Sequence, residues 1–66
     1  MLIYTTPDRI LANYLQSELQ QHSIYTVVFE KKANMYIADL RPPEFEIYTH
    51  FRQAEEALEI IYNITE

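Results

Sequence analysis

The 66-residue chain contains no cysteine, no glycine and no tryptophan. Without cysteine, no disulfide bond can stabilise a core that is small in any domain of this size, and no thiol can act as a nucleophile. Without glycine, the glycine-rich loops that hold nucleotide phosphates cannot form. The composition therefore excludes nucleotide chemistry of the phosphate-loop type, and we expect no bound cofactor.

Basic residues are also few: five lysines and arginines against ten aspartates and glutamates give a net charge of −5. The phosphate backbone of a nucleic acid repels a chain of this charge, so we expect no nucleic-acid partner. No apolar run approaches the roughly 20 residues that a membrane span needs, and the start of the chain lacks the features of a signal peptide. Together with the absence of cysteine, this predicts a cytoplasmic protein with no membrane partner.

Apolar and aromatic residues, in contrast, are abundant. They include six tyrosines and three phenylalanines, and the apolar fraction of 48% is too high for a disordered chain. The sequence shows no internal repeat and no low-complexity run. We therefore expect residues 1–66 to form one small domain.

The first part of the chain predicts a strand and then a helix. Leu2–Thr5 is a short β-prone run, and Thr6-Pro7-Asp8 is typical of a helix start with Thr6 as the cap. Ser23 follows the predicted end of the helix, at a position that often adopts a left-handed backbone conformation and is then usually glycine or asparagine. The chain must therefore leave the helix in another conformation, or the backbone of Ser23 is strained. The spacing of apolar residues predicts an amphipathic helix over 7–22, with a stripe formed by Ile10, Leu11, Tyr14, Leu15 and Leu19.

The second part predicts more strands and a second helix. The runs Ile24–Lys31 and Met35–Leu40 are rich in β-branched and aromatic residues and favour an antiparallel hairpin. Arg41-Pro42-Pro43 must be a loop, and Phe45–Tyr48 alternates like a short strand. Thr49 is a candidate cap for a helix over 49–63, whose apolar face would contain Phe51, Ala54, Leu58, Ile61 and Tyr62.

The resulting order, β-α-β-β-(β)-α, predicts an α+β fold: a two-layer sandwich with two helices on one face of a three- or four-stranded sheet. Apolar side chains alternate onto both faces of the predicted strands, so the face without helices would also be apolar. Such a surface usually marks a contact site. The candidate contact residues on the strands are Tyr25, Val27, Phe29, Tyr36 and Tyr48.

Three stretches carry a resemblance to known domains: LIYTTPDRILANYLQSELQQHSI, YTVVFE and EIYTHFRQAEEALEII. Together they resemble a small prokaryotic family of signal-transducing protein domains. They are similar, more distantly, to the cytoplasmic N-terminal domain of bacterial rhomboid proteases. The chain departs from the family at Ser23, where a glycine is typical, and in the Arg41-Pro42-Pro43 insertion. The resemblance implies a regulatory or interaction module and no catalytic chemistry.

No group of residues predicts a reaction or a metal site. His22 and His50 are the only histidines, and their separation matches no metal-binding spacing, which favours surface or capping roles. Ser17 and Ser23 have no matching histidine and acid for nucleophilic catalysis. We therefore predict no enzyme activity and assign no catalytic, cofactor-binding or metal-binding residues.

The sequence favours a protein partner or a homodimer, bound through an apolar face or an edge of the sheet. One alternative is an acidic decoy of the phage-inhibitor type, in which Glu55, Glu56, Glu59 and Glu66 bind a basic surface of a host protein. A second alternative is a module that senses a small metabolite.

Overall fold

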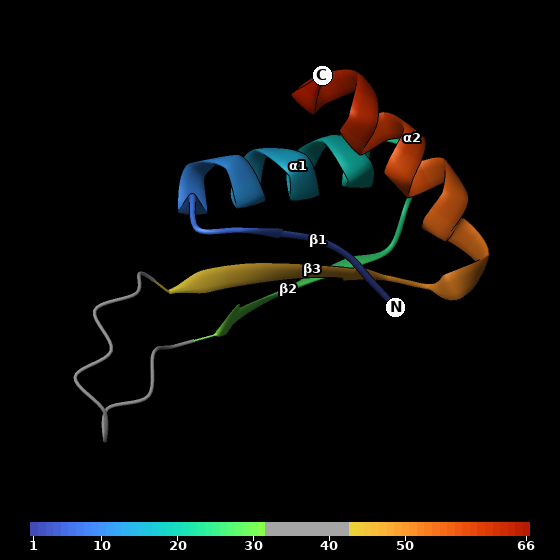
Figure 1. Ribbon diagram of the computed structural model, residues 1–66. Helices are drawn as coiled ribbons and strands as arrows, with labels where there is room; N and C mark the ends of the chain where they lie inside the picture. Colours follow the sequence, from blue (N-terminus) through green and yellow to red (C-terminus); the bar gives the residue numbers. More distant parts are fainter. Residues whose placement is uncertain (32–42) are drawn as a thin grey trace.

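The computed structural model describes residues 1–31 and 43–66, and it confirms the predicted α+β class. Two helices, α1 (Arg9–Gln21) and α2 (Ala54–Thr65), lie on one side of a three-stranded antiparallel sheet (Figure 1). The strands are β1 (Leu2–Thr6), β2 (Thr26–Lys31) and β3 (Glu44–Thr49). A short 3₁₀ turn, η1 (Phe51–Gln53), connects β3 to α2.

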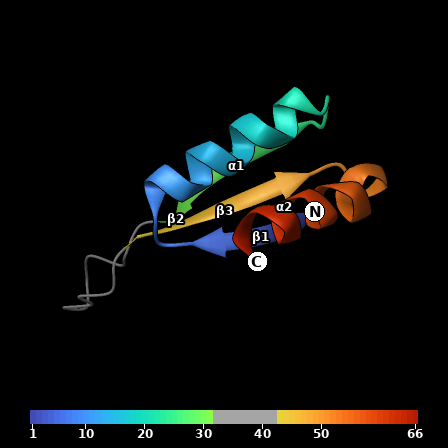
Figure 2. The ribbon, with the colours of Figure 1, turned by 90° about the horizontal axis from the view of Figure 1, so that it is seen from above.

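The sheet order is β1-β3-β2, so the last strand in the sequence is the central one (Figure 2). β3 runs antiparallel to both neighbours, and β1 and β2 are therefore parallel to each other with β3 between them. This is a split β-α-β unit. The short strand predicted at Phe45–Tyr48 is confirmed, one residue longer at each end. The strand predicted at Met35–Leu40, and the hairpin that it would form, lie outside the described residues.

Helix α1 begins two residues later than the predicted start at Pro7. The cap is Asp8, not Thr6, and its Oδ1 accepts hydrogen bonds from the N–H groups of Ile10 at 2.9 Å and Leu11 at 3.3 Å. The hydroxyl of Thr6 instead accepts the N–H of Asp8 at 3.1 Å. An aspartate caps a helix at least as well as a threonine, and its charge also interacts favourably with the helix dipole.

Helix α1 ends in a strained left-handed turn at Ser23, whose φ is 61°. The N–H of Ser23 donates to the carbonyl of Gln20 at 2.9 Å, and the N–H of Ile24 donates to that of Leu19 at 3.0 Å. These two bonds form a Schellman motif. The sequence left open whether the chain leaves the helix in another conformation or with strain at Ser23, and the structure shows the strained, left-handed conformation. This turn brings Ile24 back to pack against Leu19 in the core.

Helix α2 begins later than the predicted residue 49. Thr49 belongs to β3, and its hydroxyl donates to the carbonyl of Tyr25 at 2.7 Å, so it is not a helix cap. His50 caps η1 instead, with its Nδ1 accepting the N–H of Arg52 at 3.3 Å. Phe51, predicted to lie on the buried side of this helix, is in η1 and is 68% exposed.

The core lies between the helices and β3. Its fully buried members include Leu15 and Leu19 of α1, Ile47 of β3 and Ala57 of α2. The predicted apolar stripes were partly wrong, because a helix that lies on a sheet buries a narrower strip than its whole apolar face. The residues of those stripes that the structure leaves exposed are Ile10, Tyr14, Phe51, Leu58 and Tyr62. Neither described helix is long and apolar enough to cross a membrane.

Candidate functional site

The strand register determines which side chains face away from the helices. On β3, Phe45, Ile47 and Thr49 are buried under the helices, so the alternate residues point to the other side. We call that side the outer face. Directly opposite residues of an antiparallel pair share a face. The outer face therefore contains Leu2 and Thr5 of β1, Glu44, Glu46 and Tyr48 of β3, and Val27, Phe29 and Lys31 of β2.

One half of the outer face is an apolar hollow of about 430 Å³. Aromatic side chains dominate its lining, and three of them are more than half exposed: Tyr25 at 66%, Phe29 at 56% and Phe51 at 68%. The segments that contribute to it are the N-terminus, β2 and the β3–η1 connection. Its full lining is Met1, Tyr25, Val27, Phe29, Tyr48, Thr49, His50 and Phe51.

Aromatic contacts hold the hollow in shape. The rings of Phe29 and Tyr48 meet edge to face, with centroids 5.4 Å apart and an interplanar angle of 84°. His50 and Phe51 stack at 5.0 Å, and the guanidinium of Arg52 lies 5.7 Å from the centre of the Phe51 ring. An edge-to-face pair such as Phe29 and Tyr48 adds about 0.5–1.5 kcal/mol beyond the burial of its area. The surface is therefore partly preorganised before any partner binds.

Tyr48 connects this hollow to a charged half of the outer face. Its hydroxyl donates to Oε1 of Glu46 at 3.3 Å. Burial, then the negative charge of Glu46 and the hydrogen bond to its carboxylate, raise the pKa of the Tyr48 phenol above its ordinary value. Glu44 is directly opposite Lys31 in the strand register, and both lie on the same half of the face as Glu46. This half of the outer face is therefore charged, whereas the half with the hollow is apolar.

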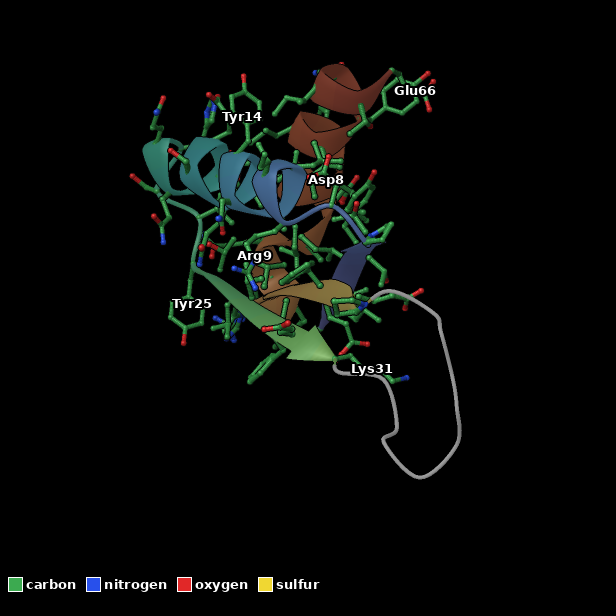
Figure 3. All side chains as sticks on the ribbon, turned by 90° about the vertical axis from the view of Figure 1, so that its left-hand side faces the viewer. Asp8, Arg9, Tyr14, Tyr25, Lys31 and Glu66 are labelled. Atoms are coloured by element: carbon green, nitrogen blue, oxygen red, sulfur yellow. The ribbon has the colours of Figure 1, made fainter. Side chains whose placement is uncertain are left out.

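Gln53 positions Tyr25 at the rim of the hollow. Its side chain accepts the N–H of Tyr25 at 3.1 Å and donates to the carbonyl of Ser23 at 3.2 Å. With the Thr49 bond to the Tyr25 carbonyl, this fixes the backbone on which the tyrosine sits. In Figure 3, Tyr25 projects from the start of β2 on the side away from Tyr14, which projects from α1.

The predicted contact residues fall into three groups. Tyr25, Val27, Phe29 and Tyr48 come together at the hollow. Tyr36 lies outside the described residues. The three acidic candidates, Glu55, Glu56 and Glu59, are exposed on α2, in the helical layer and apart from the hollow.

Five residues of the site were not among the predicted contact residues. Met1, Thr49, His50 and Phe51 line the hollow, and Gln53 holds its rim. The helical pattern assigned to residues 49–63 concealed Phe51, since a phenylalanine at helical spacing is usually buried. The sequence does contain an indication of the separate turn before α2, because the imidazole of His50 can accept a backbone N–H and so cap that turn.

The part of the chain that the structure describes contains no group of three or more histidine, cysteine, aspartate or glutamate side chains that could hold a metal ion. His22 is the residue after the end of α1, and His50 caps η1. The sequence favoured surface or capping roles for both: His22 holds the C-cap position of α1 through its backbone N–H, and the side chain of His50 caps η1.

No family model, curated protein or solved structure matches this chain. The resemblance to signal-transducing domains therefore stays a prediction.

Proposed function

We propose that this chain is a small non-catalytic interaction module of a regulatory kind, which binds a protein partner with the apolar half of its outer face. The observation that carries the proposal is the gathering of Tyr25, Val27, Phe29 and Tyr48, from separate parts of the chain, around one hollow on the side without helices. Exposed apolar patches of this sort in small soluble proteins usually serve recognition.

The composition of the face supports a protein partner over a small molecule. Tyrosine and phenylalanine bury much area at low entropic cost, and they are enriched at the centres of protein interfaces. A small-molecule pocket needs several converging polar groups to orient its ligand. Here the Tyr48 hydroxyl already bonds to Glu46, and His50 Nδ1 already accepts the N–H of Arg52.

The polarity of the face also indicates the chemistry of the partner. An apolar or aromatic group would fill the hollow, and a neighbouring basic group would meet Glu46 and Glu44 on the charged half. The proposed partner surface is therefore apolar at its centre and basic on one side.

The test compares partner recovery from a cell lysate by the full chain and by two single variants with matched exposure. Phe29→Asp places a charge in the hollow, whereas Tyr14→Asp places one on α1, where Tyr14 is 51% exposed. We expect Phe29→Asp to weaken partner binding at least about tenfold, as loss of a central aromatic contact does. Tyr14→Asp should leave binding unchanged, and circular dichroism checks that both variants fold.

The acidic-decoy alternative rests on the exposure of Glu55, Glu56 and Glu59. It predicts that binding fails in high salt and when these glutamates are changed to lysine, because exposed charge pairs are screened. The outer-face proposal predicts binding that persists in high salt and tolerates those changes. Equal binding by Phe29→Asp and the unmodified chain would refute the proposal.

A further inference from the structure

Within residues 1–31 and 43–66, β1 and β2 are the edge strands of the sheet, and they differ in how well they are protected against pairing with another strand. The register of β1 with β3 is irregular between Leu2 and Tyr4, and Pro7 directly follows the end of β1. Bulges and prolines are common devices that prevent edge-to-edge association. The β2 edge contains neither: its register with β3 is unbroken from Thr26 to Lys31, and its charged residues, Glu30 and Lys31, are confined to one end.

The hydrogen bonds at Met1 reveal which backbone groups of β2 face outward. Thr49 exchanges two bonds of 2.9 Å with Met1, so its N–H and C=O both point toward β1. Thr26, directly opposite Thr49 on the other side, must then point its own N–H and C=O away from β3. By alternation, the outward groups of β2 belong to Thr26, Val28 and Glu30.

Thr26 supplies a second and independent observation at this edge. Its side chain is buried, with 7% of the residue exposed, and its Oγ1 has no hydrogen-bond partner among the described residues. A buried hydroxyl without a partner is costly and calls for an explanation.

We infer that β2 pairs antiparallel with β2 of a second copy of this chain, about a two-fold axis at Val28. The inference goes beyond the proposed function, since the second copy binds at the β2 edge and leaves the apolar hollow to another partner. Only this register joins all three outward residues, with Val28 opposite Val28 and Thr26 opposite Glu30 of the second copy. Each outward residue then gives and accepts one backbone bond, and the two sheets become one sheet of six strands.

The side chains fit this register on both faces. On the face that the helices cover, Glu30 of the second copy is opposite Thr26. Its Oε1 lies 3.8 Å from the guanidinium of Arg9 in its own chain, which leaves Oε2 as an acceptor for the Thr26 hydroxyl. On the outer face, Val27 is opposite Phe29 of the second copy, a favourable pairing of β-branched and aromatic residues. No glutamate or lysine of β2 is opposite a like charge.

The helices leave room for the junction. α1 packs over both β2 and β3, so it does not lie wholly beyond the β2 edge. The two copies of α1 would lie on the same side of the joined sheet, where helices pack with their axes about 8–10 Å apart. The pairing also makes the outer face continuous, so that Phe29 and Val27 of the second copy extend each apolar hollow.

Single cysteine variants test this register cleanly because the chain has no cysteine of its own. Val27 and Val28 are both half-buried, which makes Val27→Cys the matched control for Val28→Cys. Two Val28 Cα atoms at the axis would be about 5.5 Å apart, a distance that a disulfide bridges. Two Val27 Cα atoms would be offset by two residues, about 8 Å apart, and beyond its reach.

We expect Val28→Cys to form a disulfide-linked dimer at least about tenfold faster than Val27→Cys under mild oxidation. Faster linkage of Val27→Cys would overturn the edge pairing and indicate contact between two outer faces. Hydrogen exchange of the unmodified chain, over a dilution series, gives a readout without substitutions. Protection at Thr26, Val28 and Glu30 should rise with concentration, whereas exchange at these amides that stays fast at every concentration would refute the dimer.

The two proposals fail separately. If no edge dimer forms but Phe29→Asp still weakens partner binding, only the proposed pairing with a second copy is wrong. A confirmed edge dimer whose partner binding ignores Phe29→Asp removes the outer-face function instead.

Discussion

Replacing Ser23 with glycine should stabilise the protein, although the change removes a side chain. Ser23 is held at φ 61° by the Schellman bonds that end α1. A residue with a Cβ atom is disfavoured there by about 1–2 kcal/mol relative to glycine. The greater freedom of glycine in the unfolded chain returns about 0.4–1 kcal/mol of this. The expected net gain in the free energy of unfolding is therefore about 0.5–1 kcal/mol.

Ser17→Gly is the matched control, because it makes the same chemical change within α1. The effect on the unfolded chain is nearly identical, so the difference between the two variants isolates the backbone conformation of the folded state. We expect Ser17→Gly to lower the free energy of unfolding by about 0.5 kcal/mol. Urea titrations followed by circular dichroism measure both values. Destabilisation of equal size in both variants would show that the turn at Ser23 is not strained.

Three further predictions concern single sites. Glu46→Gln should lower the pKa of Tyr48 toward its ordinary value, because the substitution removes the carboxylate charge, and an NMR titration measures this change. In the unmodified protein, the raised pKa of Tyr48 means that its contribution to stability is lost as pH rises above the ordinary tyrosine pKa. Asp8→Ala should cost about 1 kcal/mol of unfolding free energy through loss of the α1 cap, whereas Asp8→Asn should retain most of it. Leu15→Ala should cost about 2–5 kcal/mol, because Leu15 is fully buried, whereas Ile10→Ala at an 80% exposed position should stay within about 0.5 kcal/mol in the same denaturant assay.

Periodicity in the sequence was enough to predict the two-layer architecture. The stripe containing Leu15 and Leu19 marks α1, and the alternation around Phe45 marks the strand that proves central. The strand order could not be derived, because hydrophobic alternation assigns a face to each residue and says nothing about which strands are neighbours. Pairing depends on contacts between distant segments, and here β3 takes the middle position.

The candidate site was predicted in part for a related reason. Alternation along β2 correctly placed Val27 and Phe29 on the side opposite Val28. Phe51 was missed because its contribution depends on a 3₁₀ turn between β3 and α2, and helical spacing alone favoured an uninterrupted helix. Glu55, Glu56 and Glu59 are exposed on α2, and only the fold shows that they lie apart from the hollow.

Hydroxyl-radical footprinting of the complex with a recovered partner tests the central claim most directly, because exposed aromatic side chains report on their own burial. Tyr25, Phe29 and Phe51 lie at the hollow, and Tyr14 and Tyr62, on the helices, are internal controls of similar exposure. The account predicts that the partner protects the first three side chains from oxidation and leaves the two controls unchanged. Protection of Tyr14 and Tyr62, with Tyr25 and Phe29 oxidised as in the free protein, would contradict it.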